Sequence, residues 1–293
     1  MKNFCVLVTL ALLLPFAATA QTPPPRYGSN PAAGQYFTHD GVQLYYEVYG
    51  SGEPLLMIHG NGGDIFSLSA QIDYFRKTYK VIAMDSRDQG RSSDSPDKIT
   101  YEKMTDDLNA LLEHLNTGPV LVLGWSDGGI EGLLLALRHP DKVKKVASMA
   151  ANLNPGPDAF APEVLALIHS MLASLPASER DTPLGRREIK VVQMMLDEPH
   201  IDPKALEAIT APTLILASDH DLIRDEHTLD IYHHIPNSQL AIFPDATHLI
   251  PYDDPARFNA TVERFFATPY VKKDRVGDAM KSWDKIKAAE TQP

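Results

Sequence analysis

A serine, Ser126, lies within a short glycine-rich segment at residues 124–129, which reads Gly-Trp-Ser-Asp-Gly-Gly. An apolar run at 120–123 comes directly before it, and a helical pattern follows over residues 130–138. This order predicts a nucleophile elbow, a sharp turn from a buried strand into a helix with the serine at its apex. The glycines fit because a strained apex leaves little room for Cβ atoms. The first amides of the helix would face the space above Ser126 Oγ, where an oxyanion could form.

A serine hydroxyl becomes a good nucleophile when a histidine takes its proton, and that histidine needs an orienting carboxylate. Asp221 follows the apolar run 213–217, and His248 follows the apolar run 240–243. Their order, serine then acid then histidine, is the order that accompanies such an elbow. Three other aspartates compete for the acid role: Asp219, Asp225 and Asp245. We prefer Asp221, because two of the three lie close to a strand end and the other is expected to begin a helix.

A second glycine-rich loop, residues 59–63, reads His-Gly-Asn-Gly-Gly and follows the apolar run 55–58. Such a loop lets backbone amides approach a developing oxyanion, and we assign the two donors to the amides of Asn61 and Asp127. No Lys-Ser/Thr pair follows the glycines, so the loop is not a phosphate-binding loop. We expect His59 to support the loop by hydrogen bonding and not to act as a second base.

Short apolar runs alternate with helical patterns along most of the chain, which predicts a largely parallel sheet with helices on both faces. The alternation is interrupted at residues 152–209, where three helical patterns each begin with a proline. We interpret this segment as a helical cap inserted into a core of residues 34–151 and 210–269. The Pro-, Gly- and Ser-rich residues 21–33 are expected to form a flexible leader, and residues 270–293 a charged C-terminal tail.

Residues 1–20 have the pattern of a signal peptide: Lys2, an apolar run at 6–16, and Ala-Thr-Ala before Gln21. Cleavage after Ala20 predicts a periplasmic or secreted protein. The apolar run is too short for a comfortable membrane span, so we expect no stable membrane anchor. Cys5, the single cysteine of the chain, lies in this peptide, and the processed chain would therefore carry no disulfide.

The charge of the chain restricts its partners. The formal net charge is −11 and becomes −12 without residues 1–20, which contain one lysine and no acidic residue. Such acidity argues against nucleic acid or an anionic membrane as a partner. Several histidines lie near the acid and its helix, namely His220, His227, His233 and His234. They lack a metal-binding spacing such as H-E-x-x-H, so we expect solvated side chains, and neither a metal nor a cofactor.

Five motifs occur in an order that resembles the α/β-hydrolase family, from Tyr36 to about Ala267: residues 59–62, residues 85–92, the elbow, Asp221 and His248. The resemblance implies an α/β fold with a mostly parallel eight-stranded sheet, flanking helices and a small cap. One residue departs from the family pattern. Asp88 occupies a position in the 85–92 segment that usually carries glycine.

Within the family, residues 123–130 look like the elbow of valacyclovir hydrolase (biphenyl hydrolase-like) enzymes. That resemblance implies that Asp127, the residue after the nucleophile, binds the α-amino group of an aminoacyl ester. We also expect Trp125 to contact the substrate. A carboxylate beside the nucleophile would attract a substrate ammonium group. The alternative is that Asp127 contributes only its backbone amide and a charge at the start of the helix.

These residues predict a serine hydrolase that cleaves small carboxylic esters or related acyl compounds through an acyl-enzyme. Carbon–carbon bond hydrolases, lactonases and cofactor-free haloperoxidases or perhydrolases share the fold and remain alternatives. Serine at the elbow argues against haloalkane dehalogenase and epoxide hydrolase chemistry, which use aspartate there. A non-catalytic ligand-binding protein is less favoured, because Ser126, Asp221 and His248 are all present. The oligomeric state is left open.

Overall fold

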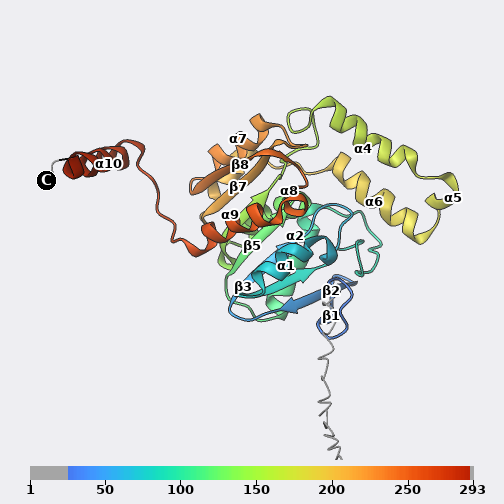
Figure 1. Cartoon of the computed structure of the whole chain (residues 1–293). Helices are drawn as coiled ribbons and strands as arrows, with labels where there is room; N and C mark the ends of the chain where they lie inside the picture. The colour runs from blue at the N-terminus through green and yellow to red at the C-terminus, as the bar shows by residue number, and fades with distance from the viewer. Residues whose placement is uncertain (1–25, 291–293) are drawn as a thin grey trace, which may run out of the picture.

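The computed structural model describes residues 26–290 and contains one eight-stranded sheet (Figure 1). The spatial order of the strands is β1-β2-β4-β3-β5-β6-β7-β8. Their bounds are β1 Gly34–His39, β2 Val42–Tyr49, β3 Glu53–Ile58, β4 Tyr79–Met84, β5 Val120–Trp125, β6 Val143–Met149, β7 Thr213–His220 and β8 Ser238–Thr247. β2 pairs antiparallel with both β1 and β4, and the pairs among β3 to β8 are all parallel. The predicted fold class, a mostly parallel eight-stranded α/β sheet, is confirmed.

Helices cover both faces of the sheet, which explains why its strands are continuously apolar. One buried cluster joins strand residues such as Leu56 and Val122 to helices α2, α3 and α7. The other joins the alternate strand residues, such as Leu55 and Leu121, to α1 and α9. The bounds of these elements and the short helices between them are η1 Ile65–Leu68, α1 Ser69–Phe75, α2 Tyr101–His114, α3 Asp127–Arg138, η2 Pro140–Lys142, α7 Asp225–His234, α8 Ile250–Asp253 and α9 Pro255–Ala267. Because neighbouring strand residues point to opposite faces, each strand needs apolar side chains at successive positions.

The segment predicted as a cap lies between β6 and β7. It contains α4 Pro162–Ser174, α5 Ala177–Arg180, α6 Pro183–Asp197 and the 3-10 helix η3 Pro203–Ala208. Helices α4 and α6 pack side by side beyond the sheet (Figure 1). Three of these helices begin with proline, whose missing amide is tolerated in a first helical turn.

The prediction of a flexible leader is wrong for residues 27–30, which pack against β2. Tyr27 is 4% exposed and makes an edge-to-face contact with Tyr49, with ring centroids 4.9 Å apart. The backbone amides of Gly28 and Asn30 donate to the buried Glu47 carboxylate at 2.8 and 2.9 Å. A buried carboxylate needs such donors, and these residues provide them. Composition indicated correctly that the segment lacks regular structure, but it gave no sign of this packing.

The ends of the chain differ in what the structure describes. The predicted signal peptide, residues 1–20, lies outside the described residues. Within residues 26–290, no helix is both long enough and apolar enough to span a membrane. The charged tail contains helix α10, Arg275–Glu290, which follows an extended segment leading away from the sheet (Figure 1). On this helix the side chains of Val276, Met280 and Trp283 are exposed.

Candidate active site

Ser126 lies at the junction of β5 and α3 with φ 58° and ψ −118°, a conformation that costs a residue other than glycine about 1–3 kcal/mol. Its amide donates to the Met149 carbonyl at 2.8 Å and ties the turn to β6. The flanking glycines are sterically required. A Cβ on Gly124 would lie 1.9 Å from the Gly128 carbonyl oxygen, and one on Gly128 would lie 2.2 Å from the Ile58 carbonyl oxygen. The backbone therefore forms the sharp strand-to-helix turn that the sequence predicts.

Asp221 and His248 come together at the carboxyl ends of β7 and β8. His248 Nδ1 lies 2.7 Å from Asp221 Oδ1, and the Asp221 side chain is fully buried. The same carboxylate accepts the amides of Leu222 at 2.8 Å and Ser218 at 3.2 Å. With these donors and the Ile223 amide at 3.3 Å around it, Asp221 is held in place and fixes the imidazole tautomer that carries its proton on Nδ1. Nε2 is then left to accept a proton from a substrate or a hydroxyl group.

The competing aspartates have other roles. Asp219 accepts the amides of Asp245 and Ala246 at 2.9 and 3.0 Å, and these bonds hold its pKa below the usual range. Asp245 itself adopts φ 52° at that turn. Asp225 is the first residue of α7, as expected. Of the four candidates, Asp221 is the one that contacts His248.

A cavity of about 410 Å³ brings the predicted residues together. Its polar side is formed by Tyr101 of α2 and by residues of the elbow, the 59–63 loop and the histidine loop, among them Asn61, Trp125, Ser126, Asp127 and His248. Its apolar side comes mainly from the cap, with Val164, Leu167, Ile168 and Met171 of α4 and Met195 of α6. A substrate in this cavity would meet the serine at one wall and the cap at the other. The sequence predicted the cap but did not indicate which of its residues face the site.

Trp125, predicted as a substrate contact, also holds the histidine loop. Its indole Nε1 donates to the His248 carbonyl at 3.0 Å, and the indole and imidazole centroids are 6.0 Å apart. The contact joins the residue before Ser126 directly to His248. Trp125 therefore supports the position of the imidazole and at the same time borders the cavity.

The Asp127 side chain is held by two donors. Tyr101 Oη donates to Asp127 Oδ1 at 2.8 Å, and Asn61 Nδ2 donates to Asp127 Oδ2 at 2.9 Å. Burial raises the pKa of Asp127, while these two hydrogen bonds oppose the rise. Sequence reasoning missed Tyr101, because nothing distinguishes it from any aromatic residue at the start of a helix. Asp127 thus presents an oriented carboxylate at the cavity, in addition to its backbone amide.

The loop predicted to supply an oxyanion donor passes close to Ser126. A Cβ on Gly60 would lie 3.1 Å from Ser126 Cβ, and the Gly62 amide donates to Gln89 Oε1 at 2.7 Å. Asp127 is the first residue of α3, so its amide belongs to the helix start, where amides lack intrahelical acceptors. Both predicted donor residues border the cavity that contains Ser126.

His59 has the supporting role expected of it. It is 1% exposed, its Nδ1 donates to the Gly60 carbonyl at 2.8 Å, and its Nε2 accepts the Ser86 amide at 3.0 Å. Burial lowers the pKa of His59 and favours the neutral ring. Both ring nitrogens are occupied, so His59 cannot serve as a second base.

Histidine 227 differs from expectation. It is 6% exposed, not solvated, and its Nε2 accepts the Leu153 amide at 2.9 Å, which ties α7 to the chain after β6. Burial lowers the pKa of His227. Among residues 26–290, no group of three or more His, Cys, Asp or Glu side chains is arranged to hold a metal ion.

Comparison with known proteins finds hydrolases that resemble this chain in sequence and fold. The family described as alpha/beta hydrolase fold matches residues 53–190. The uncharacterized hydrolase YraK of Bacillus subtilis is 33% identical over 105 residues, which are 35% of this chain and 39% of YraK. Serine hydrolase BPHL of Homo sapiens is 26% identical over 275 residues, covering 82% of this chain and 90% of that protein.

A solved structure shows the same fold. MGS-M2, an alpha/beta hydrolase enzyme from a deep-sea metagenome library, has a TM-score of 0.69 at 22% identity, covering 82% of this chain and 100% of that chain. The strand order, the family match and the hydrolase relatives together identify this chain as a hydrolase with the α/β-hydrolase fold.

Proposed function

We propose that this hydrolase cleaves small carboxylic esters or related acyl compounds through a Ser-His-Asp triad. Ser126 Oγ attacks the carbonyl carbon while His248 Nε2 takes the hydroxyl proton, and Asp221 orients and balances the imidazolium. The amides of Asn61 and Asp127 stabilise the tetrahedral oxyanion. His248 then gives its proton to the leaving alcohol. In the second half of the reaction, His248 takes a proton from water as the water attacks the acyl carbonyl, and it returns that proton to Ser126 Oγ as the acid leaves.

The observation that carries this proposal is the hydrogen bond between His248 and the buried Asp221, at the edge of a cavity that also contains Ser126. The test compares Ser126→Ala with Ser67→Ala, a second serine that lines the cavity and donates to the Asp64 carbonyl. We expect Ser126→Ala to abolish labelling by a fluorophosphonate and to lower ester turnover by roughly 10³-fold or more. Ser67→Ala should retain both. A folded Ser126→Ala variant with near-full turnover would refute the mechanism.

Esters of α-amino acids are a second candidate substrate class, favoured by the oriented Asp127 carboxylate at the cavity. An ammonium group next to the scissile carbonyl would form a charge-assisted hydrogen bond with it. We expect Asp127→Asn to lower kcat/KM for an aminoacyl ester by roughly 10- to 100-fold, the scale of one lost charged contact. A simple acyl ester should change little. Equal losses on both esters would show that the Asp127 side chain does not recognise the ammonium group, and would leave only the backbone amide with a role.

We also propose that residues 1–20 are removed during export to the periplasm or the medium. The support is the sequence pattern of Lys2, the apolar run and the Ala-Thr-Ala segment. N-terminal sequencing of protein recovered from a bacterial periplasmic or culture fraction should begin at Gln21. A chain that stays in the cytoplasm with residue 1 intact would refute the export proposal.

A further inference from the structure

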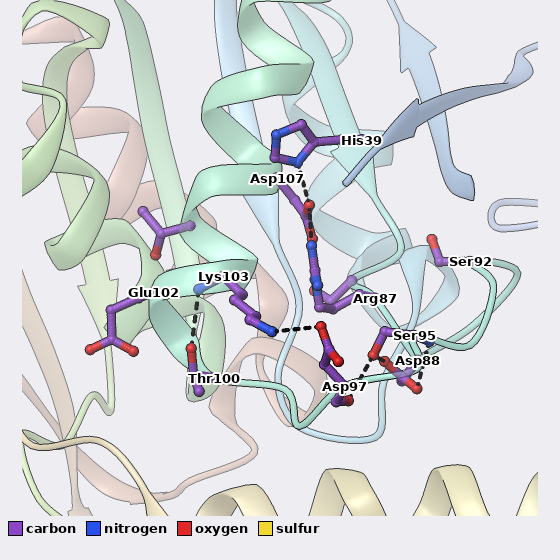
Figure 2. A network of polar contacts seen from close by, with 12 residues as sticks. His39, Arg87, Asp88, Ser92, Ser95, Asp97, Thr100, Glu102, Lys103 and Asp107 are labelled. Carbon is purple, nitrogen blue, oxygen red and sulfur yellow. Dashed lines mark hydrogen bonds and ion pairs between the residues drawn. The ribbon is translucent and has the colours of Figure 1, made fainter. Parts of the chain in front are cut away.

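Asp88, which replaces the usual family glycine, is bound by a residue of the cap. Its side chain is fully buried, and its carboxylate accepts the Ser95 amide at 3.1 Å and the Ser95 hydroxyl at 2.5 Å (Figure 2). Lys190 Nζ of α6 donates to Asp88 Oδ1 at 2.6 Å and to the Ser95 carbonyl at 2.6 Å. Asp88 adopts φ 61°, so this backbone position would suit glycine better. The aspartate is therefore conformationally costly, and it creates an ion pair between core and cap in which Asp88 is buried and the Lys190 side chain is 26% exposed.

The loop that carries Asp88 is itself fixed to the core. Arg87 forms a bidentate pair with Asp107 of α2 at 2.6 and 2.7 Å, and both side chains are buried. His39 of β1 contacts the same carboxylate at 2.8 Å (Figure 2). Asp107 of α2 thus holds the loop through Arg87, and His39 of β1 in turn contacts Asp107. Lys190 therefore binds a loop that is anchored to the core through Arg87.

The residue after Lys190 connects the cap to the active site. The Val191 carbonyl accepts a hydrogen bond from Asn61 Nδ2 at 3.1 Å, and the same amide nitrogen donates to Asp127 Oδ2 at 2.9 Å. Asn61 is the predicted oxyanion donor, and Asp127 follows the nucleophile. Because Lys190 and Val191 are neighbours in one helix, fixing Lys190 also fixes the acceptor that orients the Asn61 side chain.

We propose that Asp88 and Lys190 are positioning residues that hold α6 against the 59–63 loop, so that Val191 keeps Asn61 aligned with Asp127. This inference rests on the proposed serine hydrolase function, whose turnover it would adjust without touching the substrate. When the ion pair is lost, the loop backbone near Ser126 should lose its alignment for the transition state. Misalignment of this kind lowers kcat more than it raises KM for a simple ester.

The chain offers a matched control at the other end of α6. Lys98 lies 3.2 Å from Asp197 and 3.6 Å from Glu198, and its side chain is 56% exposed, compared with 38% for Asp197 and 14% for Glu198. An exposed ion pair such as Lys98–Asp197 contributes little to stability. The Asp88 carboxylate is buried, so the loss of its partner Lys190 would leave a buried charge without a counter-ion. Both pairs join α6 to the core segment after β4. The variants Lys190→Met and Lys98→Met therefore remove the same charge from the same interface.

The experiment measures kcat and KM of the mature protein on a simple chromogenic ester. We expect Lys190→Met and Asp88→Gly to lower kcat roughly ten-fold or more, with a smaller change in KM, while Lys98→Met stays near wild type. Lys190→Arg should retain most of the activity. A double-mutant cycle gives the decisive result: with Asn61→Ala already present, Lys190→Met should have little further effect. Additive losses would overturn the proposal, because they would indicate a general loosening of the cap.

Hydrogen exchange tests the same idea without turnover. Backbone amides of α6 and of residues 59–63 should exchange faster in Lys190→Met than in Lys98→Met. Equal exchange and equal kcat in the two variants would overturn the positioning role. Absence of fluorophosphonate labelling at Ser126 in the wild type would instead overturn the proposed function, and the exchange result would still decide whether Lys190 fixes the loop.

Discussion

The buried side chain of Glu131 should make the stability of this protein depend on pH. It lies one helical turn after Asp127, is fully buried, and has no hydrogen-bond partner for either carboxylate oxygen within the described structure. Burial raises the pKa of Glu131 well above its ordinary value, and the nearby Asp127 and Asp107 add to the rise. A carboxylate without a donor in such a place is far less stable than the neutral acid. We therefore expect Glu131 to release its proton at a higher pH in the folded chain than in the unfolded chain.

The magnitude follows from proton linkage. Above the ordinary value of 4.5, the unfolded chain releases the Glu131 proton while the folded chain keeps it. The folded state then binds one proton more than the unfolded state, so the free energy of unfolding falls by about 1.4 kcal/mol per pH unit until the folded pKa is reached. The loss continues with rising pH for as long as Glu131 stays protonated in the folded chain. Glu131→Gln has a neutral head of the same shape and should not show this loss.

The assay is urea unfolding followed by circular dichroism at pH 5.5, 6.5 and 7.5. The stability of Glu131→Gln should be within about 1 kcal/mol of wild type at pH 5.5 and should exceed it by a margin that grows with pH. Glu113→Gln is the control, because the Glu113 side chain is 58% exposed and pairs with Lys142 at 3.5 Å. Its difference from wild type should stay nearly constant. Parallel pH curves for wild type and Glu131→Gln would show that Glu131 ionises normally, which would refute the reasoning.

Three further predictions concern the elbow, the acid and a buried lysine. Gly124→Ala should prevent stable folding, because its Cβ would lie 1.9 Å from the Gly128 carbonyl oxygen; a cooperative unfolding transition near that of wild type would contradict this. Asp221→Asn should leave the fold intact but lower kcat by about 10⁴-fold, since the amide no longer fixes the His248 tautomer; a loss below ten-fold would assign the acid role elsewhere. Lys145 Nζ donates to three carbonyls at the end of α9, at 2.7 to 2.9 Å, so Lys145→Met should lower the unfolding free energy by roughly 2–4 kcal/mol, and unchanged urea midpoints would contradict the role.

The parts of the site that could be predicted from sequence are those fixed by strand ends. Ser126, Asp221 and His248 each follow an apolar run, and in a parallel sheet the carboxyl ends of such runs meet at one edge. The glycines of the elbow could also be predicted, because a Cβ atom at these positions would clash with neighbouring backbone. The fold followed from the same alternation of apolar runs and helices.

The residues that sequence did not reveal act across long separations without a motif. Tyr101 reaches Asp127 from the first residue of α2, and Lys190 reaches Asp88 over 102 positions. Neither residue type is unusual where it stands, and only the packing of the helices brings these pairs together. Tyr27 shows the converse: an irregular, proline-rich segment can still be packed when a buried group such as Glu47 requires its amides.

Two buried acids on one face of α3 differ in a way that bears on what the site can bind. Asp127 accepts hydrogen bonds from Tyr101 and Asn61, whereas Glu131 accepts none within the described structure. Donors favour the ionised form and an undonated apolar site favours the acid, so a single proton shared between them belongs on Glu131. Ionisation is therefore more favourable at Asp127, which borders the cavity beside Ser126, than at Glu131 one helical turn later. Tyr101 and Asn61 therefore decide whether a cationic substrate group meets a charge near the nucleophile, although neither residue changes charge itself.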